Sequence, residues 1–463
     1  MPTIRYVPVM TEFWFPACPS LGTGRLPKRS MSTAFEVVVV GSGAGGAAVA
    51  HELAKRGRSV LVLEAGPDVK ESHLGGMFAA AVSPGYYDRM ALFSRSVEGS
   101  IIYHTSNLGG TTVFACGNMV RNSEIERRIS FDFGMAGLSE CFDEAENEST
   151  ARPLPLDSIV GLSRRLMEGA RSLGYDARPA SKGFVDRWAC KACGNCIFGC
   201  RYGAKWDSRR YLTSASVGGA TIRTGTRVER LLLDGTTVKG VVVTNRRGRE
   251  RIESEAVVVA AGALNTPVIL QASGIECGKG LFVDYFACVY GIADRGTQLL
   301  GQTMSFLIDE SREQGFMISP FVDDQVQYLL FCPLSRTFST GFSRRHLAGL
   351  LVKIGDDRAG WVAADGTIHK APTPTDRATM QRGLKVAGEI LEASGARKLV
   401  TTQVWRGAHP GGTAAIGETV GNDLKVRGME RLYVCDASVL PFAPGLPPIL
   451  TITAMGKWLG KRV

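Results

Sequence analysis

The stretch VVVVGSGAGGAAVAHELAKRG, near the start of the chain, restricts the possible folds more than any other feature of the sequence. Residues 34–40 are apolar and β-branched, which predicts a buried parallel strand. Residues 47–56 predict a helix that ends at Gly57, and residues 59–63 predict a second buried strand that leads into Glu64. A strand, a helix and a strand in this order predict a βαβ unit of a parallel α/β sheet.

Three glycines stand between the first predicted strand and the helix in the pattern G-x-G-x-x-G. Gly41 permits a tight turn, Gly43 lets a pyrophosphate approach the backbone, and Gly46 lets the helix pack on the strand. The free amides and the dipole at the helix start favour the phosphates. Glu64 follows Gly41 by 23 positions, which places its carboxylate to accept hydrogen bonds from ribose hydroxyls. The unit therefore predicts a dinucleotide cofactor rather than a glycine-rich turn without a ligand.

Four of the 11 cysteines lie within residues 190–200, CKACGNCIFGC. The spacing C-x2-C-x2-C-x3-C is that of a bacterial iron–sulfur run, and Gly194 and Gly199 let the loop fold back around a metal. We favour an iron–sulfur cluster over a structural zinc and over unliganded or redox-active thiols. In two-cluster ferredoxins the fourth cysteine of such a run binds the other cluster. A single run of this kind can therefore hold a [3Fe-4S] cluster, or a [4Fe-4S] cluster with the loop bent differently, and we prefer the [4Fe-4S] cluster. The candidate ligands are Cys190, Cys193, Cys196 and Cys200.

The length, charge and cysteine content of the chain limit the class of protein to which it can belong. The chain of 463 residues is long enough for two connected domains, and no apolar run approaches the ~18–20 residues that cross a bilayer. The net charge of +10 fits anionic cofactors, an acidic protein partner or a membrane surface. Without a nucleic-acid motif or a block of like charge, no nucleic-acid partner is expected. The other cysteines are scattered and odd in number, a poor disulfide framework. We expect a cytoplasmic protein, with peripheral membrane attachment as the alternative.

The rest of the chain predicts further strands and helices. Short alternating segments between residues 290 and 360 predict an antiparallel sheet, which is the usual platform of a substrate domain. The predicted elements are a hairpin over 228–245 that turns at Asp234-Gly235, strands at 255–261, 303–308, 327–331 and 431–434, and helices at 265–272, 375–394 and from Pro447-Pro448 to Leu459.

Four motifs together resemble the glucose–methanol–choline (GMC) oxidoreductases. They are GSGAGG…VLVLEAG, LGGTT at 108–112, VVVAAGALNTPVILQASGI at 257–275, and the tail HPGGTAAIG…LYVCDASVLP…PPILTITAMGKWL. They occur in the family's order over most of the chain from Phe35 onward. The resemblance implies an α/β (α+β) fold, with a Rossmann-like FAD-binding domain and an antiparallel-sheet substrate domain. It also implies FAD rather than NAD, and oxidation of an alcohol, polyol or sugar hydroxyl by hydride transfer to the flavin.

The resemblance also implies roles for individual residues. His409 of HPGGT matches the catalytic histidine of the family. The expected FAD contacts are Gly41, Gly43, Gly46 and Glu64 for the ADP half, Gly109 and Gly110 near the isoalloxazine ring, Val228 by the adenine, Ala261 and Gly262 on the pyrophosphate side, and Asp436 and Ala437 in the pyrophosphate–ribityl region.

The sequence departs from the family pattern at several places. Phe114 stands where covalently flavinylated relatives have a histidine, so we expect non-covalent FAD. Pro447 stands at the place of the usual second active-site histidine or asparagine, and it offers no donor. Asp284-Tyr285 is similar to the family's NLxDH with the histidine lost, and we interpret this pair as structural. GTAAIG replaces GTCRMG, and the chain is shorter than most members.

We therefore expect an FAD-dependent dehydrogenase whose electrons leave through an iron–sulfur cluster to a protein or quinone acceptor. Two alternatives are an auxiliary flavin and iron–sulfur electron-transfer subunit, and a flavin enzyme that acts on C=C bonds. Residues 1–30 lack the apolar core of a signal peptide, and Met31 is an alternative start. The expected parts are an N-terminal extension (1–33), the FAD-binding domain (34–180, 211–288 and 396–463), the cysteine loop (181–210) and the substrate domain (289–395).

Overall fold

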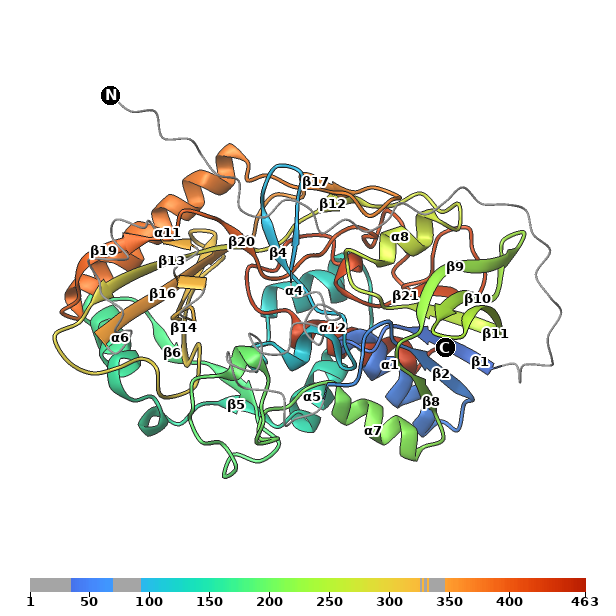
Figure 1. The fold of residues 1–463 in the computed structure, drawn as a ribbon, viewed down its shortest axis with the longest axis horizontal. Helices are drawn as coiled ribbons and strands as arrows, with labels where there is room; N and C mark the ends of the chain where they lie inside the picture. Colours follow the sequence, from blue (N-terminus) through green and yellow to red (C-terminus); the bar gives the residue numbers. More distant parts are fainter. Residues whose placement is uncertain (1–34, 70–92, 325–326, 329–330, 333–345) are drawn as a thin grey trace. The chain divides into compact units, whose positions relative to one another are not determined.

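The computed structural model describes residues 35–69, 93–324, 327–328, 331–332 and 346–463. Expectations for residues 1–33 lie outside this part. The described residues belong to one compact unit that contains two large sheets, each with its own hydrophobic core (Figure 1). The domain boundaries given above stay a prediction. No helix among the described residues has the length and apolarity needed to cross a membrane.

The first sheet has seven strands and contains the predicted βαβ unit. Its order is β8-β2-β1-β11-β10-β9, and β21 pairs with β11. β8, β2, β1, β11 and β21 are mutually parallel, whereas β9 and β10 extend the sheet in antiparallel fashion. The strands are β1 (Phe35–Val40), β2 (Val60–Leu63), β8 (Thr221–Arg223), β9 (Arg227–Asp234), β10 (Thr237–Asn245), β11 (Gly248–Val259) and β21 (Leu432–Val434).

Helices bury the parallel part of this sheet. α1 (Ala44–Lys55) follows β1 and packs against α12 (Ile449–Gly460), so the two ends of the described chain lie side by side (Figure 1). A Cβ atom on Gly456 would lie 2.7 Å from the Gly45 carbonyl oxygen, which shows how closely the two helices approach. The remaining helices are α4 (Ser123–Arg127), α5 (Leu138–Glu148), α6 (Gly161–Ser172), α7 (Arg209–Val217), α8 (Thr266–Gln271) and α11 (Pro374–Ala393).

The second sheet has nine strands and is antiparallel except where β20 pairs with β4. Its order is β3-β4-β20-β13-β16-β15-β14-β6, and β19 pairs with β13. The strands are β3 (Phe93–Arg95), β4 (Ile101–Tyr103), β6 (Ala177–Pro179), β13 (Tyr285–Ile292), β14 (Phe306–Glu310), β15 (Phe316–Pro320), β16 (Leu347–Ile354), β19 (Arg397–Thr401) and β20 (Arg406–Gly407). Two small sheets pair β5 (Ala151–Pro153) with β7 (Ser181–Gly183), and β12 (Lys279–Leu281) with β17 (Gly360–Val362) and β18 (Ile368–His369).

Both faces of the nine-stranded sheet are buried. α11 covers one face, where alternate residues such as Leu350 and Val352 of β16 form a core with it (Figure 1). Leu351 of the same strand joins a second core on the opposite face, with Phe286 and Cys288. Every residue of β16 is buried, so a charged residue in that strand requires a partner inside the protein.

One predicted strand is wrong. The described residues of the segment 327–331 are helical. Asp324 accounts for the difference: its side chain accepts a hydrogen bond from the Gln327 amide at 3.1 Å, and its carbonyl accepts one from the Tyr328 amide at 2.8 Å. This local cap favours a helical turn over the strand that the apolar pattern predicted. The strand predicted at 303–308 is found a few residues later, as β14.

Candidate active site and cysteine pocket

The start of α1 is arranged to receive an anion. Its N-cap is Gly43, no side chain caps it, and its first turn holds no acidic residue. A Cβ atom on Gly41 would lie 2.2 Å from the Ala260 carbonyl oxygen, and one on Gly46 would lie 2.2 Å from that of Gly41. A Cβ atom on Gly43 would meet nothing within 4 Å. Gly41 and Gly46 thus permit close backbone packing, while Gly43 leaves the helix start open, as a pyrophosphate requires.

Glu64 ties the glycine-rich loop to the double glycine. Its Oε2 accepts hydrogen bonds from the amide (3.2 Å) and the hydroxyl (2.5 Å) of Ser42, and its Oε1 accepts one from the Gly66 amide at 2.8 Å. Burial raises the pKa of Glu64, and these hydrogen bonds oppose that rise. The Ser42 hydroxyl in turn accepts a hydrogen bond from the Gly109 amide at 3.0 Å. Gly109 and Gly110 therefore lie beside the loop that the sequence assigns to the ADP half.

Val228 is also brought to this region. It is a buried residue of β9, two positions after Thr226, whose amide donates to the Glu64 carbonyl at 2.9 Å. The chain therefore passes the end of β2 just before β9 begins, and Val228 packs in the same core as β1 and β2. The adenine contact that the resemblance implies for Val228 stays a prediction.

Residues 435–437, in the C-terminal part of the chain, lie against the glycine-rich loop that precedes α1. Asp436 Oδ2 accepts hydrogen bonds from the Gly262 amide (2.9 Å) and the Thr266 hydroxyl (2.6 Å). Burial raises the pKa of Asp436. A Cβ atom on Gly45 would lie 1.9 Å from the Cys435 carbonyl oxygen, so this segment touches the first turn of α1. The Ala437 carbonyl accepts a hydrogen bond from the Gly412 amide at 3.1 Å and connects this segment to the HPGGT turn.

Several buried oxygen atoms around these segments have no hydrogen-bond partner within the part of the chain that the structure describes. Two of them lie within two residues of a predicted cofactor residue, namely Asn107 Oδ1 and Ser438 Oγ. Buried polar atoms are normally paired, so orphaned oxygens next to the glycine loops fit a polar ligand. Together with the open helix start, they fit an FAD molecule held by the predicted residues.

His409 lies at the centre of a hydrogen-bonded network that the sequence did not predict. Its Nδ1 atom lies 2.9 Å from Asp284 Oδ2 and 3.1 Å from Lys353 Nζ, and Lys353 Nζ lies 3.2 Å from the same Asp284 oxygen. Asp284 and Lys353 are almost completely buried, whereas 22% of the His409 side chain is exposed. Asp284, which we interpreted as structural, thus contacts the predicted catalytic histidine directly.

A second buried ion pair supports Asp284 from behind. Asp356 accepts hydrogen bonds from the Asp284 amide (2.6 Å) and the Val283 amide (3.0 Å), and it forms an ion pair with Lys370 at 2.6 Å. Asp284 itself has a φ of 49°, which is unusual for a residue with a side chain. Backbone strain of this kind persists only where surrounding contacts enforce it, and it is common at active sites.

The network holds His409 neutral. Burial and the nearby positive charge of Lys353 lower the pKa of His409 to about 4, against the opposing effect of Asp284. When the imidazole carries its proton on Nδ1, that proton is donated to Asp284 and the lone pair of Nε2 is left free. When Lys353 donates to Nδ1 instead, Nε2 carries the proton. The balance between Asp284 and Lys353 therefore sets whether Nε2 can act as a base.

Pro447 does not supply a polar group to this network. α12 starts at Ile449 with Pro448 as its N-cap, as the sequence predicted within one or two residues. The lysine that does contact His409 is Lys353, which arrives from β16 and lies against Nδ1. The signal in the sequence was a single lysine within the otherwise apolar run LAGLLVKI.

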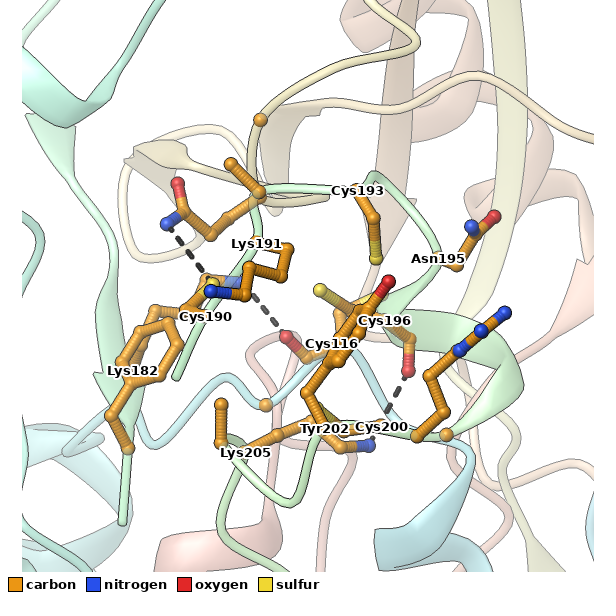
Figure 2. Close-up of a pocket in the computed structure, with 18 of the residues that line it drawn as sticks. Cys116, Lys182, Cys190, Lys191, Cys193, Asn195, Cys196, Cys200, Tyr202 and Lys205 are labelled. Carbon is orange, nitrogen blue, oxygen red and sulfur yellow. Dashed lines mark hydrogen bonds between the residues drawn. The ribbon is translucent and has the colours of Figure 1, made fainter. Parts of the chain in front are cut away.

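The four cysteines of the run line one cavity (Figure 2). The cavity walls also include Cys116, Lys182 and Lys205, which come from other parts of the chain. The segment 301–303 supports the run, through hydrogen bonds from the Gly301 amide to the Ala192 carbonyl (2.7 Å) and from the Thr303 hydroxyl to the Gly194 carbonyl (2.9 Å). The ten cysteines among the described residues are all free thiols.

The cavity contains two buried lysines without a carboxylate partner. Lys205 Nζ donates to four carbonyls, of which the nearest are Ala115 (2.6 Å) and Val113 (2.7 Å). Lys182 Nζ donates to the carbonyls of Thr303 (2.6 Å) and Cys116 (2.9 Å). Neither lysine forms an ion pair with a carboxylate among the described residues, and burial lowers the pKa of both. An anionic group in the cavity would be stabilised by these two side chains.

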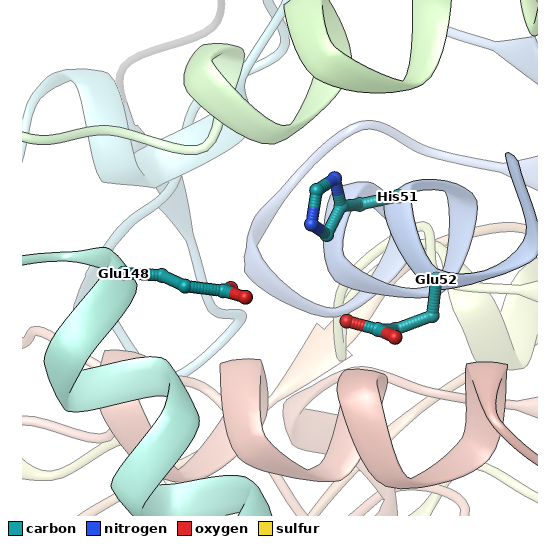
Figure 3. A group of neighbouring side chains, drawn as sticks. All are labelled: His51, Glu52 and Glu148. Atoms are coloured by element: carbon teal, nitrogen blue, oxygen red, sulfur yellow. The ribbon is translucent and has the colours of Figure 1, made fainter. Parts of the chain in front are cut away.

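A different cluster, formed by His51, Glu52 and Glu148, gathers three potential metal ligands within 4.8 Å (Figure 3). Lys457 already provides the positive charge there, because its Nζ forms ion pairs with Glu52 and, at 2.9 Å, with Glu148. Burial lowers the pKa of His51. We assign this cluster to the packing of α1, α5 and α12 rather than to a metal.

Comparison with known proteins agrees with this geometry. The sequence patterns of the N- and C-terminal parts of the GMC oxidoreductases match residues 35–285 and 355–456. The chain therefore belongs to the GMC oxidoreductase family. It is an FAD-dependent oxidoreductase that acts on CH–OH groups.

Individual relatives extend along most of the chain. A GMC-type oxidoreductase of Mycobacterium tuberculosis is 29% identical over 91% of this chain and 75% of its own length. A long-chain-alcohol oxidase of Arabidopsis thaliana is 26% identical over 92% of this chain and 67% of its own length. The crystal structure of pyridoxine 4-oxidase from Mesorbium loti superposes with a TM-score of 0.71 at 18% identity, over 92% of this chain and 99% of that chain. This structural likeness confirms the predicted fold.

Proposed function

We propose that this protein oxidises an alcohol, polyol or sugar hydroxyl with His409 as the catalytic base. The contact between His409 and Asp284 is the observation that carries this proposal. It supports a histidine with a fixed orientation and an available Nε2, and the lowered pKa keeps the imidazole neutral, and so able to accept a proton, at physiological pH. The long-chain-alcohol oxidase among the relatives supports an alcohol as the substrate class.

The protein residues divide the work of the reaction. FAD held by the predicted residues would supply the acceptor for the hydride of the carbon that carries the hydroxyl. His409 Nε2 takes the hydroxyl proton, so that positive charge does not build up on the substrate oxygen. Asp284 accepts a hydrogen bond from Nδ1–H and stabilises the imidazolium that forms, while the charge of Lys353 helps to keep the resting imidazole neutral. The expected cofactor residues are those described above, and Phe114 supports non-covalent binding.

We further propose that an iron–sulfur cluster in the cysteine pocket carries electrons from the flavin to a protein or quinone acceptor. The charge of Lys182 and Lys205 supports an anionic metal–thiolate group there. The spacing C-x2-C-x2-C-x3-C favours such a cluster, in which each thiolate binds its own iron, over a single structural zinc.

Three alternative functions remain to be tested. An oxidase that passes electrons to oxygen is favoured by the names of relatives such as the long-chain-alcohol oxidase. An auxiliary electron-transfer subunit, or an enzyme that acts on C=C bonds, is favoured by Pro447 in place of a second polar residue.

A cytoplasmic location is supported by the free thiols of the described residues.

The test combines a substrate screen with one variant. Alcohols, polyols and sugars are mixed anaerobically with the FAD-loaded protein, and flavin bleaching is followed by stopped flow. His409→Ala should keep FAD but slow flavin reduction at least ~100-fold, while His369→Ala, at a partly exposed position, should not. Reduction of the His409 variant at the wild-type rate would remove the proposed base. Rapid reoxidation by air, without a dye acceptor, would favour the oxidase. FAD released into the supernatant on acid precipitation checks that it is non-covalent.

A further inference from the structure

The cysteine pocket contains a fifth thiol that lies outside the run. Cys116 lines the same cavity as Cys190, Cys193, Cys196 and Cys200, although 74 positions separate it from the first of them (Figure 2). Its neighbours include Cys196, Lys182 and Lys205. The other described cysteines outside the run belong to other parts of the core, such as Cys141 in α5 and Cys288 in β13.

The segment that carries Cys116 begins at the flavin site. Gly109, whose amide donates to Ser42, is the N-cap of a short 3₁₀ helix over Gly110–Val113. Cys116 follows that helix by only three residues. A chain of eight residues therefore runs from the double glycine beside the predicted flavin position to the wall of the cysteine pocket.

Buried lysines clamp this segment against the run. Lys205 Nζ donates to the Val113 and Ala115 carbonyls on the segment, and at 3.3 Å to the Cys196 carbonyl on the run. Lys182 Nζ donates to the carbonyl of Cys116 itself at 2.9 Å. Two ammonium groups thus fix the position of the fifth thiol, and a buried ammonium that has only carbonyl partners is costly unless an anion lies close by.

We propose that Cys116 is a ligand of the iron–sulfur cluster, and that Lys182 and Lys205 are the counter-charges of that cluster. This inference rests on the cluster proposed above. A cubane core has four irons, so five thiols exceed its needs by one. In ferredoxin runs the fourth cysteine binds elsewhere, which makes Cys200 the spare thiol and Cys116 the ligand that replaces it. The cluster is then bound from the flavin side, directly at the end of the Gly109–Cys116 segment.

The first test measures metal rather than activity. Wild type, Cys116→Ser, Cys193→Ser and Cys200→Ser are purified anaerobically with FAD bound, and iron, acid-labile sulfide and EPR spectra are recorded. Cys141→Ser, at a buried thiol in α5, is the matched control. Cys116→Ser should lose iron, down to a three-iron EPR signal or to none, with FAD content unchanged, while Cys200→Ser should keep its iron.

The outcomes distinguish the assignment of Cys116 as a ligand from the proposal of an iron–sulfur cluster on which it rests. A Cys116→Ser protein with wild-type iron, sulfide and EPR spectrum would overturn the assignment of Cys116, even if Cys193→Ser loses its iron. A wild-type protein without iron, prepared under conditions that load clusters in general, would overturn the cluster itself and the Cys116 assignment with it.

A second measurement tests the counter-charges. Lys205→Met removes a buried positive charge, so the reduction potential of the cluster should fall, because the reduced and more negative cluster loses the larger stabilisation. Lys191→Met removes an exposed lysine that lines the same cavity, and its effect should be much smaller since water and salt screen it. Equal potentials in Lys205→Met and wild type would contradict the role given to Lys205.

Discussion

Buried lysines lie at both chemical sites of this protein, and they differ in what neutralises them. Lys353 beside His409 forms an ion pair with Asp284 at 3.2 Å. Within the described part of the chain, the side chains of Lys182 and Lys205 in the cysteine pocket donate hydrogen bonds to backbone carbonyls only. All three side chains are buried, and burial lowers the pKa of each.

The difference shows how each site is completed. At His409 the protein supplies its own counter-charge, so the base and the groups that orient it are assembled by folding alone. In the cysteine pocket the proposed cluster and its thiolates would supply the balancing negative charge. A site of the first kind should be damaged by removing a carboxylate, and a site of the second kind should respond to loading with metal.

The largest effect is expected from Asp284→Asn. The amide can donate to Nδ1, which would leave the proton on Nε2 and remove the base. In triads of this geometry such a change costs up to about 10⁴-fold, and we expect flavin reduction to slow by roughly 100-fold or more. Anaerobic stopped flow measures the step, and FAD content controls for folding. Asp323→Asn, which breaks the buried contact with Arg406 at 2.7 Å, is a matched control for loss of a buried carboxylate. A rate within a few-fold of wild type would show that Asp284 does not set the tautomer.

These contacts explain which parts of the molecule the sequence could predict. The βαβ unit, the β9–β10 hairpin and α11 are local, so short patterns of apolar residues and caps predicted them within a few residues. His409 was predicted because its motif resembles that of a family. Asp284 and Lys353 were not predicted as partners, since 125 and 56 positions separate them from His409. No local pattern records such a contact, and the same holds for Cys116 and the run.

The second prediction compares the two kinds of lysine by stability. Lys353→Met leaves Asp284 buried without its cation, and breaking one partner of a buried pair costs about 3–5 kcal/mol. Lys205→Met removes an ammonium that forms no ion pair with a carboxylate among the described residues, although the charge of Asp207 raises its pKa, so the loss in the iron-free protein should be smaller. Chemical denaturation of FAD-loaded, iron-free protein measures both free energies of unfolding. Equal losses would mean that carbonyls balance Lys205 as well as a carboxylate balances Lys353.

The third prediction concerns pH. Because the pKa of His409 is lowered to about 4, the imidazole stays neutral above that pH, and flavin reduction should remain constant until the pH falls towards 4. In Lys353→Met the repelling charge is gone while Asp284 remains, so the pKa should rise towards the ordinary value of about 6.5. The acid limb of the rate profile should therefore move up by one or two pH units, since protonation removes the base. If the acid limb of Lys353→Met stayed at the wild-type pH, Lys353 would not be one of the groups that set the pKa of His409.

The smallest effect on flavin reduction is expected when the cysteine pocket is altered and the His409 site is left intact. Cys193→Ser should abolish the cluster, yet flavin reduction by substrate in a single turnover should stay within about 3-fold of wild type. The reason is that Asp284, Lys353 and His409 are held by β13, β16 and the HPGGT turn. The cysteine run is connected to the flavin side through Lys205 and residues 112–115 instead. Reoxidation of the flavin by an artificial one-electron acceptor should be slowed in the same variant, because the proposed exit for electrons is lost. If flavin reduction fell with the cluster while FAD stayed bound, the two sites would form one catalytic unit, and the contrast between them would not hold.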